Sequence, residues 1–111
     1  MSNKISVGVL GATGMVGQSF VKFLEGHPWF ELTWVGASDR SAGKKYSSAT
    51  SWRLEGSMPE TVAGLTVSEC VPTTDAPKLV FSAMDASVAT EIERAFAEAG
   101  HLVVSNSKNH R

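Results

Sequence analysis

The sequence has little of what marks several large classes of protein. Its single cysteine, Cys70, excludes a disulfide framework within the chain. No apolar run approaches the roughly 18 residues of a membrane-spanning helix, and no secretory signal precedes the apolar run at residues 5–10. Ten Lys and Arg against eleven Asp and Glu give a net charge of −1, too small a field to favour nucleic acid or a membrane surface. We therefore expect a soluble, cytoplasmic protein that binds neither.

The sequence also lacks the spacings of a metal site and of a nucleophilic catalytic site. His27, His101 and His110 do not stand at metal-ligand spacings, so no metal is predicted. Cys70 follows an expected strand with no His or Asn motif nearby, and an inert buried thiol is the favoured interpretation. No residue of the chain is predicted to be catalytic.

The composition is that of one ordinary globular domain. Of 111 residues, 42% are hydrophobic and 19% are charged, which is not the composition of a disordered chain. A chain of this length buries about two thirds of its unfolded surface, enough for one core.

Short β-type runs alternate with helical periodicity along the chain. The runs expected to form strands are residues 5–10, 31–35, 65–69, 78–83 and 102–105. Val16, Phe20, Phe23 and Leu24 form the apolar stripe of an amphipathic helix after the first run, and a second helical period follows residue 85. The alternation predicts the α/β class, with a mainly parallel sheet of about five strands flanked by helices.

Residues 38–64 break this pattern. They are rich in serine and glycine and show no sustained periodicity. A stretch this long without structure of its own is uncommon unless it is functional or disordered.

A glycine-rich loop joins the first expected strand to the first expected helix. Gly11, Gly14 and Gly17 give the pattern G-x-x-G-x-x-G, a variant of the dinucleotide fingerprint. Small residues let the backbone approach a pyrophosphate, and the helix N-terminus behind them offers free N–H groups and a partial positive charge. The position between strand and helix predicts a Rossmann-like NAD(P)-binding domain, with a ligand-free tight turn as the alternative.

The residues after the second expected strand favour NADP over NAD. NAD-specific sheets usually carry Asp or Glu there, to bind the ribose 2′-hydroxyl. Ser38 and Arg40 suit a 2′-phosphate instead, because a hydroxyl and a guanidinium both donate hydrogen bonds to it. Asp39 is the evidence for NAD, and a solvated loop charge is the alternative interpretation of Arg40.

Two further segments end expected strands on the same side of the sheet. Residues 82–85 lie at the C-terminal end of the fourth strand, and residues 105–108 lie in the equivalent place at the end of the fifth. Ligands of open α/β sheets bind beyond the carboxyl ends of the strands, so both segments can line the nicotinamide side of the crevice. Asp85 has an alternative role as a helix cap.

Several blocks of the sequence together resemble the aspartate-semialdehyde dehydrogenases, and in particular those of the fungal and archaeal branch. The matching blocks are Gly11–Gln18, Ala37–Lys44, Phe81–Ala83 and Val104–Arg111. The resemblance implies an enzyme that uses NADPH to convert L-4-aspartyl phosphate reversibly to L-aspartate 4-semialdehyde and phosphate. This reaction serves the biosynthesis of lysine, threonine, methionine and isoleucine.

The resemblance also implies roles for the matched residues. Cofactor binding is expected at Gly11, Thr13, Gly14, Met15, Val16, Ser38, Arg40, Ser41, Ser82, Ala83 and Asn106. Of these, residues 13–16 would bind the pyrophosphate, and Ser38, Arg40 and Ser41 the 2′-phosphate. Arg111 matches the arginine that binds the transferred phosphate.

The chain departs from the family in lacking its catalytic cysteine and histidine segments. Residues 1–111 are therefore expected to be the N-terminal dinucleotide-binding domain, inactive and prone to self-association alone, without the catalytic and dimerisation domain. The full enzyme is expected to be a homo-oligomer, a dimer or tetramer, that takes a small-molecule substrate. The alternatives are the sister reductase for N-acetyl-glutamyl phosphate and a stand-alone nucleotide-binding module without catalysis.

Overall fold

The computed structural model describes residues 4–37, 40–54, 56–72, 76–84 and 86–105, with side chains undescribed at 86–88 and 105. The elements in chain order are β1 (Ile5–Leu10), α1 (Met15–Leu24), β2 (Phe30–Ala37), α2 (Tyr46–Ala49), α3 (Glu60–Ala63), β3 (Val67–Glu69), β4 (Leu79–Ser82), α4 (Ala86–Glu98) and β5 (Leu102–Ser105). Among the described residues, no helix combines the length and apolar character needed to cross a membrane.

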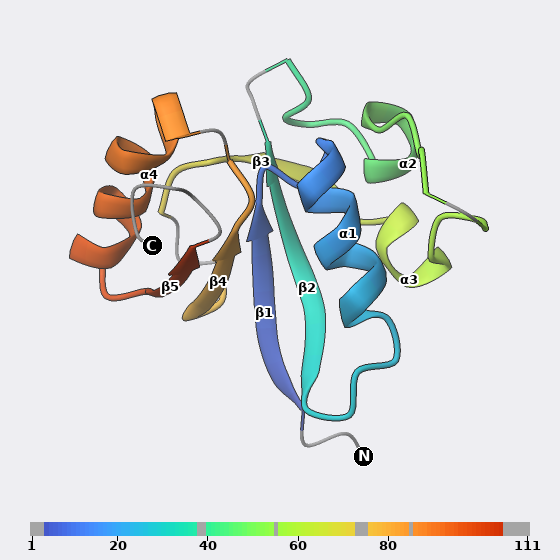
Figure 1. Cartoon of the computed structure of the whole chain (residues 1–111), viewed down its shortest axis with the longest axis horizontal. Coiled ribbons are helices and arrows are strands. Elements are labelled where there is room, and N and C mark those ends of the chain that lie inside the picture. Colours follow the sequence, from blue (N-terminus) through green and yellow to red (C-terminus); the bar gives the residue numbers. More distant parts are fainter. Residues whose placement is uncertain (1–3, 38–39, 55, 73–75, 85, 106–111) are drawn as a thin grey trace.

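The strands form one five-stranded sheet in the order β3-β2-β1-β4-β5, and each neighbouring pair is parallel. This confirms the predicted α/β class and the parallel sheet. Figure 1 shows the central strand β1, with α1, α2 and α3 on one side of the molecule and α4 beside β4 and β5 on the other. Because all strands run the same way, their carboxyl ends meet at one edge of the sheet, where the loops after β1, β2 and β4 begin.

The alternation of side chains along the strands divides the core in two. On one face, Val7 and Val9 of β1 pack with Val21 of α1, Tyr46 of α2 and Val62 of α3. These side chains are almost completely buried. The α1 layer therefore includes the two short helices of the 38–64 region as part of its core.

On the other face, the Trp34 indole fills the layer between the sheet and α4. A Cβ at Gly8 or Gly36 would lie within 2.9 or 2.8 Å of the Trp34 ring, so the ring lies against strand backbone at both positions. Its other neighbour is Phe96 of α4, whose ring meets it edge-on at a centroid distance of 6.0 Å. Aromatic pairs favour this arrangement.

The predicted apolar stripe of α1 is half right as a description of the buried face, because Leu24 is buried and Phe20 packs against the core, whereas Val16 and Phe23 do not. The buried residues of α1 are Gly17, Gln18, Val21 and Leu24. Val16 and Phe23 remain 43% and 64% exposed. The helix turns its glycine toward the strand–loop junction because only glycine allows so close an approach, and this rotates the larger apolar side chains away.

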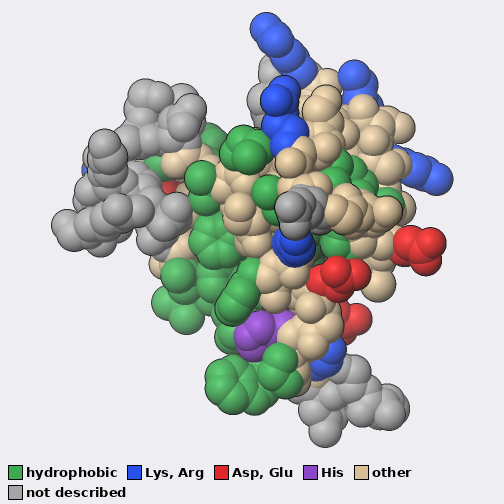
Figure 2. All heavy atoms as spheres, turned by 45° about the vertical axis from the view of Figure 1, so that its right-hand side comes forward, with side chains coloured by type: hydrophobic (Ala, Val, Ile, Leu, Met, Phe, Trp, Pro, Cys, Tyr) green, Lys and Arg blue, Asp and Glu red, His purple; other side chains and the backbone are tan. Residues whose placement is uncertain are grey.

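Those larger side chains belong to a second apolar surface, which α1 shares with β4 and β5. Phe20 stacks on Phe81 of β4 at a centroid distance of 5.5 Å. Phe81 pairs with Val104, so these neighbours in the parallel sheet point to the same face. Val104 and, two residues earlier, Leu102 are exposed. Figure 2 shows hydrophobic side chains spread over this part of the molecule.

The 38–64 region is more regular than the sequence predicts. It contains α2 and α3, each of four residues. A bridge between Lys45 and Thr66 fastens it beside β3. The region is thus a packed part of the α1 layer.

Candidate functional site

The glycine loop lies at the carboxyl edge of the sheet, where the order of connections reverses. The chain leaves β1 for β2 on one side, and β4 lies on the other. The N–H groups of Gly11 and Ala12 both donate to the carbonyl of Gly36, at 2.8 and 3.0 Å. The N–H of Ala83 donates to the carbonyl of Leu10 at 2.9 Å. The loop is therefore fixed between β2 and β4, at the switch point where open α/β sheets bind ligands.

The three glycines of the loop meet three different requirements. Gly11 has φ +74°, which side-chain-bearing residues rarely adopt. A Cβ at Gly17 would lie 2.7 Å from the Ala12 Cα, so α1 and the loop pack backbone to backbone there. At Gly14 the nearest atom to such a Cβ is the Gly11 carbonyl oxygen, 3.8 Å away. The space beside Gly14 therefore offers a Cβ only an ordinary van der Waals contact, and this lack of crowding is compatible with a bound pyrophosphate.

The N-terminus of α1 opens directly behind this space. Gly14 is its N-cap and supplies no capping side chain. Met15 and Val16, in the first turn, are exposed. The first N–H groups of a helix have no partner within the helix and carry its partial positive charge, so this end suits an anion. The predicted residues Gly11, Thr13, Gly14, Met15 and Val16 are thus brought together.

Two polar side chains support the loop from behind. The Gln18 side-chain Nε2 donates to the carbonyls of Thr13 and Ser51, both at 3.0 Å. The Tyr46 hydroxyl donates to the Ala12 carbonyl at 2.7 Å. Neither residue stands out in the sequence, since their partners lie up to 35 residues away. Tyr46 is, however, the only tyrosine in the chain.

Basic side chains gather near the same edge. Arg40 follows β2 and is exposed, while Ser41 is half-buried and its carbonyl accepts the N–H of Lys44 at 3.2 Å. Lys44, Lys45 and Arg53 are also exposed. Figure 2 shows Lys and Arg side chains at the upper end of the molecule, where β1 and β2 end in Figure 1. Ser38 and Asp39 lie outside the described residues.

The end of β4 and the residue after it form the opposite wall of the loop. The Ala83 carbonyl oxygen would lie 3.2 Å from a Cβ at Gly11. Ser82 is completely buried, and its hydroxyl has no hydrogen-bond partner among the described residues. Asn106 and Arg111 lie outside the described residues, so their predicted roles stay predictions.

Cys70 lies beneath the loop as a half-buried free thiol. Its Sγ would be 3.3 Å from a Cβ at Gly36. Burial raises the pKa of the Cys70 thiol, which keeps it protonated near neutral pH. In the described part of the chain, no cluster of His, Cys, Asp and Glu could hold a metal ion.

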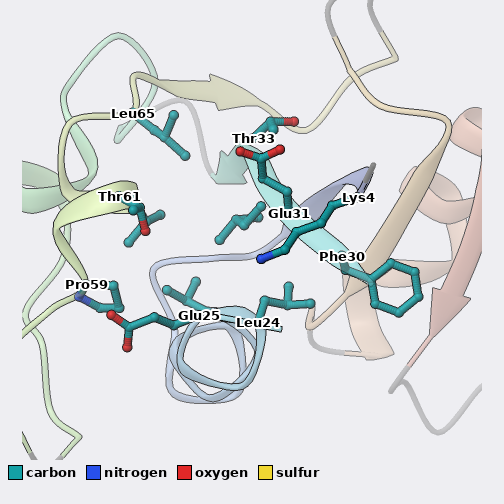
Figure 3. Close-up of a pocket in the computed structure, with 13 residues that line it drawn as sticks. Lys4, Leu24, Glu25, Phe30, Glu31, Thr33, Pro59, Thr61 and Leu65 are labelled. Carbon is teal, nitrogen blue, oxygen red and sulfur yellow. The ribbon is translucent and has the colours of Figure 1, made fainter. Parts of the chain in front are cut away.

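A hollow of about 520 Å³ lies at the opposite edge of the sheet (Figure 3). It is bounded by the amino-terminal starts of β1 and β2, the end of α1 and the α3 region, with Lys4, Glu25 and Glu31 as its charged residues. Its apolar floor includes Leu24 and Leu32. It shares no residue with the loop site.

Comparison with known proteins gives one consistent result. Residues 6–111 match the family model described as "Semialdehyde dehydrogenase, NAD binding domain". An aspartate-semialdehyde dehydrogenase of Candida albicans is 53% identical over 106 residues, which are 94% of this chain and 29% of that protein. The enzymes of that name from Saccharomyces cerevisiae and Archaeoglobus fulgidus are 49% and 44% identical, over 100% and 97% of this chain and 31% and 32% of theirs.

Comparison with solved structures gives the same result as the comparison of sequences. A crystal structure of aspartate-semialdehyde dehydrogenase with NADP from Candida albicans matches with a TM-score of 0.92 and 50% identity, over 97% of this chain and 31% of that one. A Vibrio cholerae aspartate-semialdehyde dehydrogenase II matches with a TM-score of 0.67 and 24% identity, over 96% of this chain and 31% of that one, which shows the shared fold alone. The chain thus spans less than a third of the length of these relatives.

Proposed function

The chain belongs to the semialdehyde dehydrogenase NAD-binding domain family, and we propose that it is the NADP-binding part of an aspartate-semialdehyde dehydrogenase. The observation that carries the proposal is the junction of β1, the glycine loop and α1. The uncrowded space beside Gly14 and the start of α1 without a capping side chain fit a pyrophosphate. The backbone of the chain as a whole matches that of a relative solved with NADP, with a TM-score of 0.92. The relatives' names favour this enzyme over the sister reductase.

We assign the described residues to binding and orienting the cofactor. The backbone of Thr13, Gly14, Met15 and Val16 would bind the pyrophosphate. The Arg40 guanidinium would pair with the 2′-phosphate, with Ser41 beside it. Ala83 would line the nicotinamide side, where NADPH supplies a hydride when bound, with the buried Ser82 next to it in the chain.

The reaction of the whole protein is part of the same proposal. It is the reversible conversion of L-4-aspartyl phosphate to L-aspartate 4-semialdehyde and phosphate, in a cytoplasmic homo-oligomer. The raised pKa of Cys70 and its place beneath the loop argue against its acting as the nucleophile. We therefore expect the 111-residue chain alone to bind cofactor without turning over substrate.

Cofactor choice tests the proposal through Arg40→Ala. The 2′-phosphate of NADP carries close to two negative charges, whereas NAD has a hydroxyl there. Because hydrogen bonds to charged groups contribute about 1.5–3 kcal/mol, the variant should bind NADP roughly ten- to a hundredfold more weakly and NAD almost unchanged. Titration calorimetry with both cofactors measures the difference.

Arg94→Ala is the matched control, because it removes an exposed arginine from α4. It should leave both affinities unchanged. Equal losses for NADP and NAD in Arg40→Ala would mean that Arg40 supports the loop without reading the phosphate. A native protein that binds neither cofactor would contradict the proposed function itself.

A further inference from the structure

Gln18 is a buried polar residue on the inner face of α1. Its side chain is 1% exposed. Burying a carboxamide is unfavourable unless its N–H and C=O groups find partners, so a residue at this place needs a compensating network.

The network is complete on both ends of the carboxamide. Nε2 donates to the carbonyls of Thr13 and Ser51, and Oε1 accepts the N–H of Arg53 at 2.9 Å. Two carbonyls require the NH₂ group and one N–H requires the oxygen, so the neighbours fix which way the amide points. Gln18 therefore ties the glycine loop to residues 51–53, which follow α2.

Tyr46 makes a second tie, which joins the glycine loop to the start of α2. It is the first residue of α2, it is completely buried, and its hydroxyl donates to the carbonyl of Ala12. The two side chains thus hold two successive carbonyls of the loop, those of Ala12 and Thr13.

The direction of each of these carbonyls determines the direction of the N–H group that follows it in the same peptide plane. In a trans peptide the C=O and the following N–H point in opposite directions, and the described chain has no cis peptide. With the Ala12 carbonyl turned back onto Tyr46, the N–H of Thr13 is turned away from α2. The Thr13 carbonyl, turned onto Gln18, fixes the plane that leads into Gly14, whose N–H donates to the Gly11 carbonyl at 3.3 Å and closes the turn of the loop.

We propose that Gln18 and Tyr46 are positioning residues, which hold the glycine loop in the form that binds the cofactor pyrophosphate and make that form depend on the α2 segment. This inference rests on the proposed function. It assigns residues 46–53 a role in cofactor affinity without contact between Gln18 or Tyr46 and the cofactor.

The test compares two ligands on three variants of the purified protein. Gln18→Met keeps the length of the side chain and removes its hydrogen bonds, and Tyr46→Phe removes one hydroxyl. The control, Phe96→Leu, loosens the opposite layer. The ligands are NADP and adenosine 2′-monophosphate, which carries the 2′-phosphate without a pyrophosphate.

Gln18→Met should weaken NADP binding about ten- to a hundredfold, because it leaves buried carbonyls without donors. Tyr46→Phe should weaken it less, since only one bond is lost. Both variants should bind adenosine 2′-monophosphate as the native protein does. Phe96→Leu should lower the unfolding midpoint and leave both affinities unchanged.

Amide hydrogen exchange without ligand gives an independent readout. In Gln18→Met, exchange should accelerate at loop residues 11–17 and at Arg53 together, with β5 unchanged. Three results in Gln18→Met would each overturn the inference. They are equal losses of affinity for NADP and adenosine 2′-monophosphate, an unchanged affinity for NADP, and unchanged hydrogen exchange in residues 11–17. If the native protein binds no NADP, the proposed function fails, and the exchange result still decides whether Gln18 positions the loop.

Discussion

Gly17 illustrates how much of the site depends on the absence of one methyl group. In Gly17→Ala the new Cβ would meet the Ala12 Cα at 2.7 Å and its carbonyl carbon at 2.8 Å. Both are backbone atoms, so α1 or the loop must move. Such overpacking costs about 1–3 kcal/mol or more. We expect a lower urea midpoint and weakened NADP binding.

The control for this substitution is Gly64→Ala. Gly64 has φ −88°, and a Cβ there meets nothing within 4 Å. It should leave the urea midpoint unchanged or raise it slightly, because alanine reduces the freedom of the unfolded chain. Equal midpoints for the two variants would show that the contact at Gly17 is not tight.

At the scale of the residue, the sequence predicts the glycine loop but not the hydrogen bonds from Gln18 that hold it. The glycines recur within seven residues, and the pattern follows a strand and precedes a helix, so local information is sufficient. The bonds of Gln18 to Ser51 and Arg53 span 33 and 35 residues. Nothing near Gln18 in the chain shows that its carboxamide would find partners inside the fold.

At the scale of the element, α2 should make stability depend on alkaline pH. Burial raises the pKa of Tyr46 to about 12, against about 10 in an unfolded chain. The contribution of Tyr46 to the free energy of unfolding is fully present below pH 10. Between pH 10 and 12 only the unfolded state loses the proton, so the free energy of unfolding should fall by up to about 1.4 kcal/mol per pH unit.

Tyr46→Phe separates this effect from the other groups that titrate in the same range, including the Cys70 thiol. The native protein should lose stability more steeply from pH 10 to 12 than the variant in urea titrations. Because Tyr46 is the only tyrosine, the absorbance of tyrosinate reports its ionisation directly. A midpoint near pH 10 in the folded protein would contradict the buried hydroxyl.

The elements also show where periodicity fails as a guide. β1 and β5 have the predicted bounds, because their apolar runs end at turn residues. In α1, apolar residues occupy two faces, and periodicity alone cannot tell which one the sheet covers. The close contact at Gly17 decides it. The helices α2 and α3 are too short, at four residues each, to show a period at all.

At the scale of the whole molecule, the apolar surface shared by α1 and β5 should cause self-association of the 111-residue chain. Phe23 and Leu102 are 64% and 66% exposed. Large exposed apolar patches promote association in water. Sedimentation velocity should show oligomers that grow with concentration, and the double variant Phe23→Glu, Leu102→Glu should shift the population toward monomer.

Ser48→Glu adds a charge at an exposed residue of α2 and serves as the control, with no expected change in the oligomers. A native chain that stays monomeric at millimolar concentration would show that the surface does not drive association.

The central place of β1 has a further consequence, for the order in which the sheet can assemble. Val7 pairs with Leu32 on one side and with Leu79 on the other. During synthesis at about 5–20 residues per second, the second partner emerges several seconds after the first strand. Until then one edge of β1 has no neighbour, and an unpaired strand edge is a template for wrong partners. During synthesis, β1, the central strand of the finished sheet, is therefore exposed to wrong strand pairing until β4 has been made.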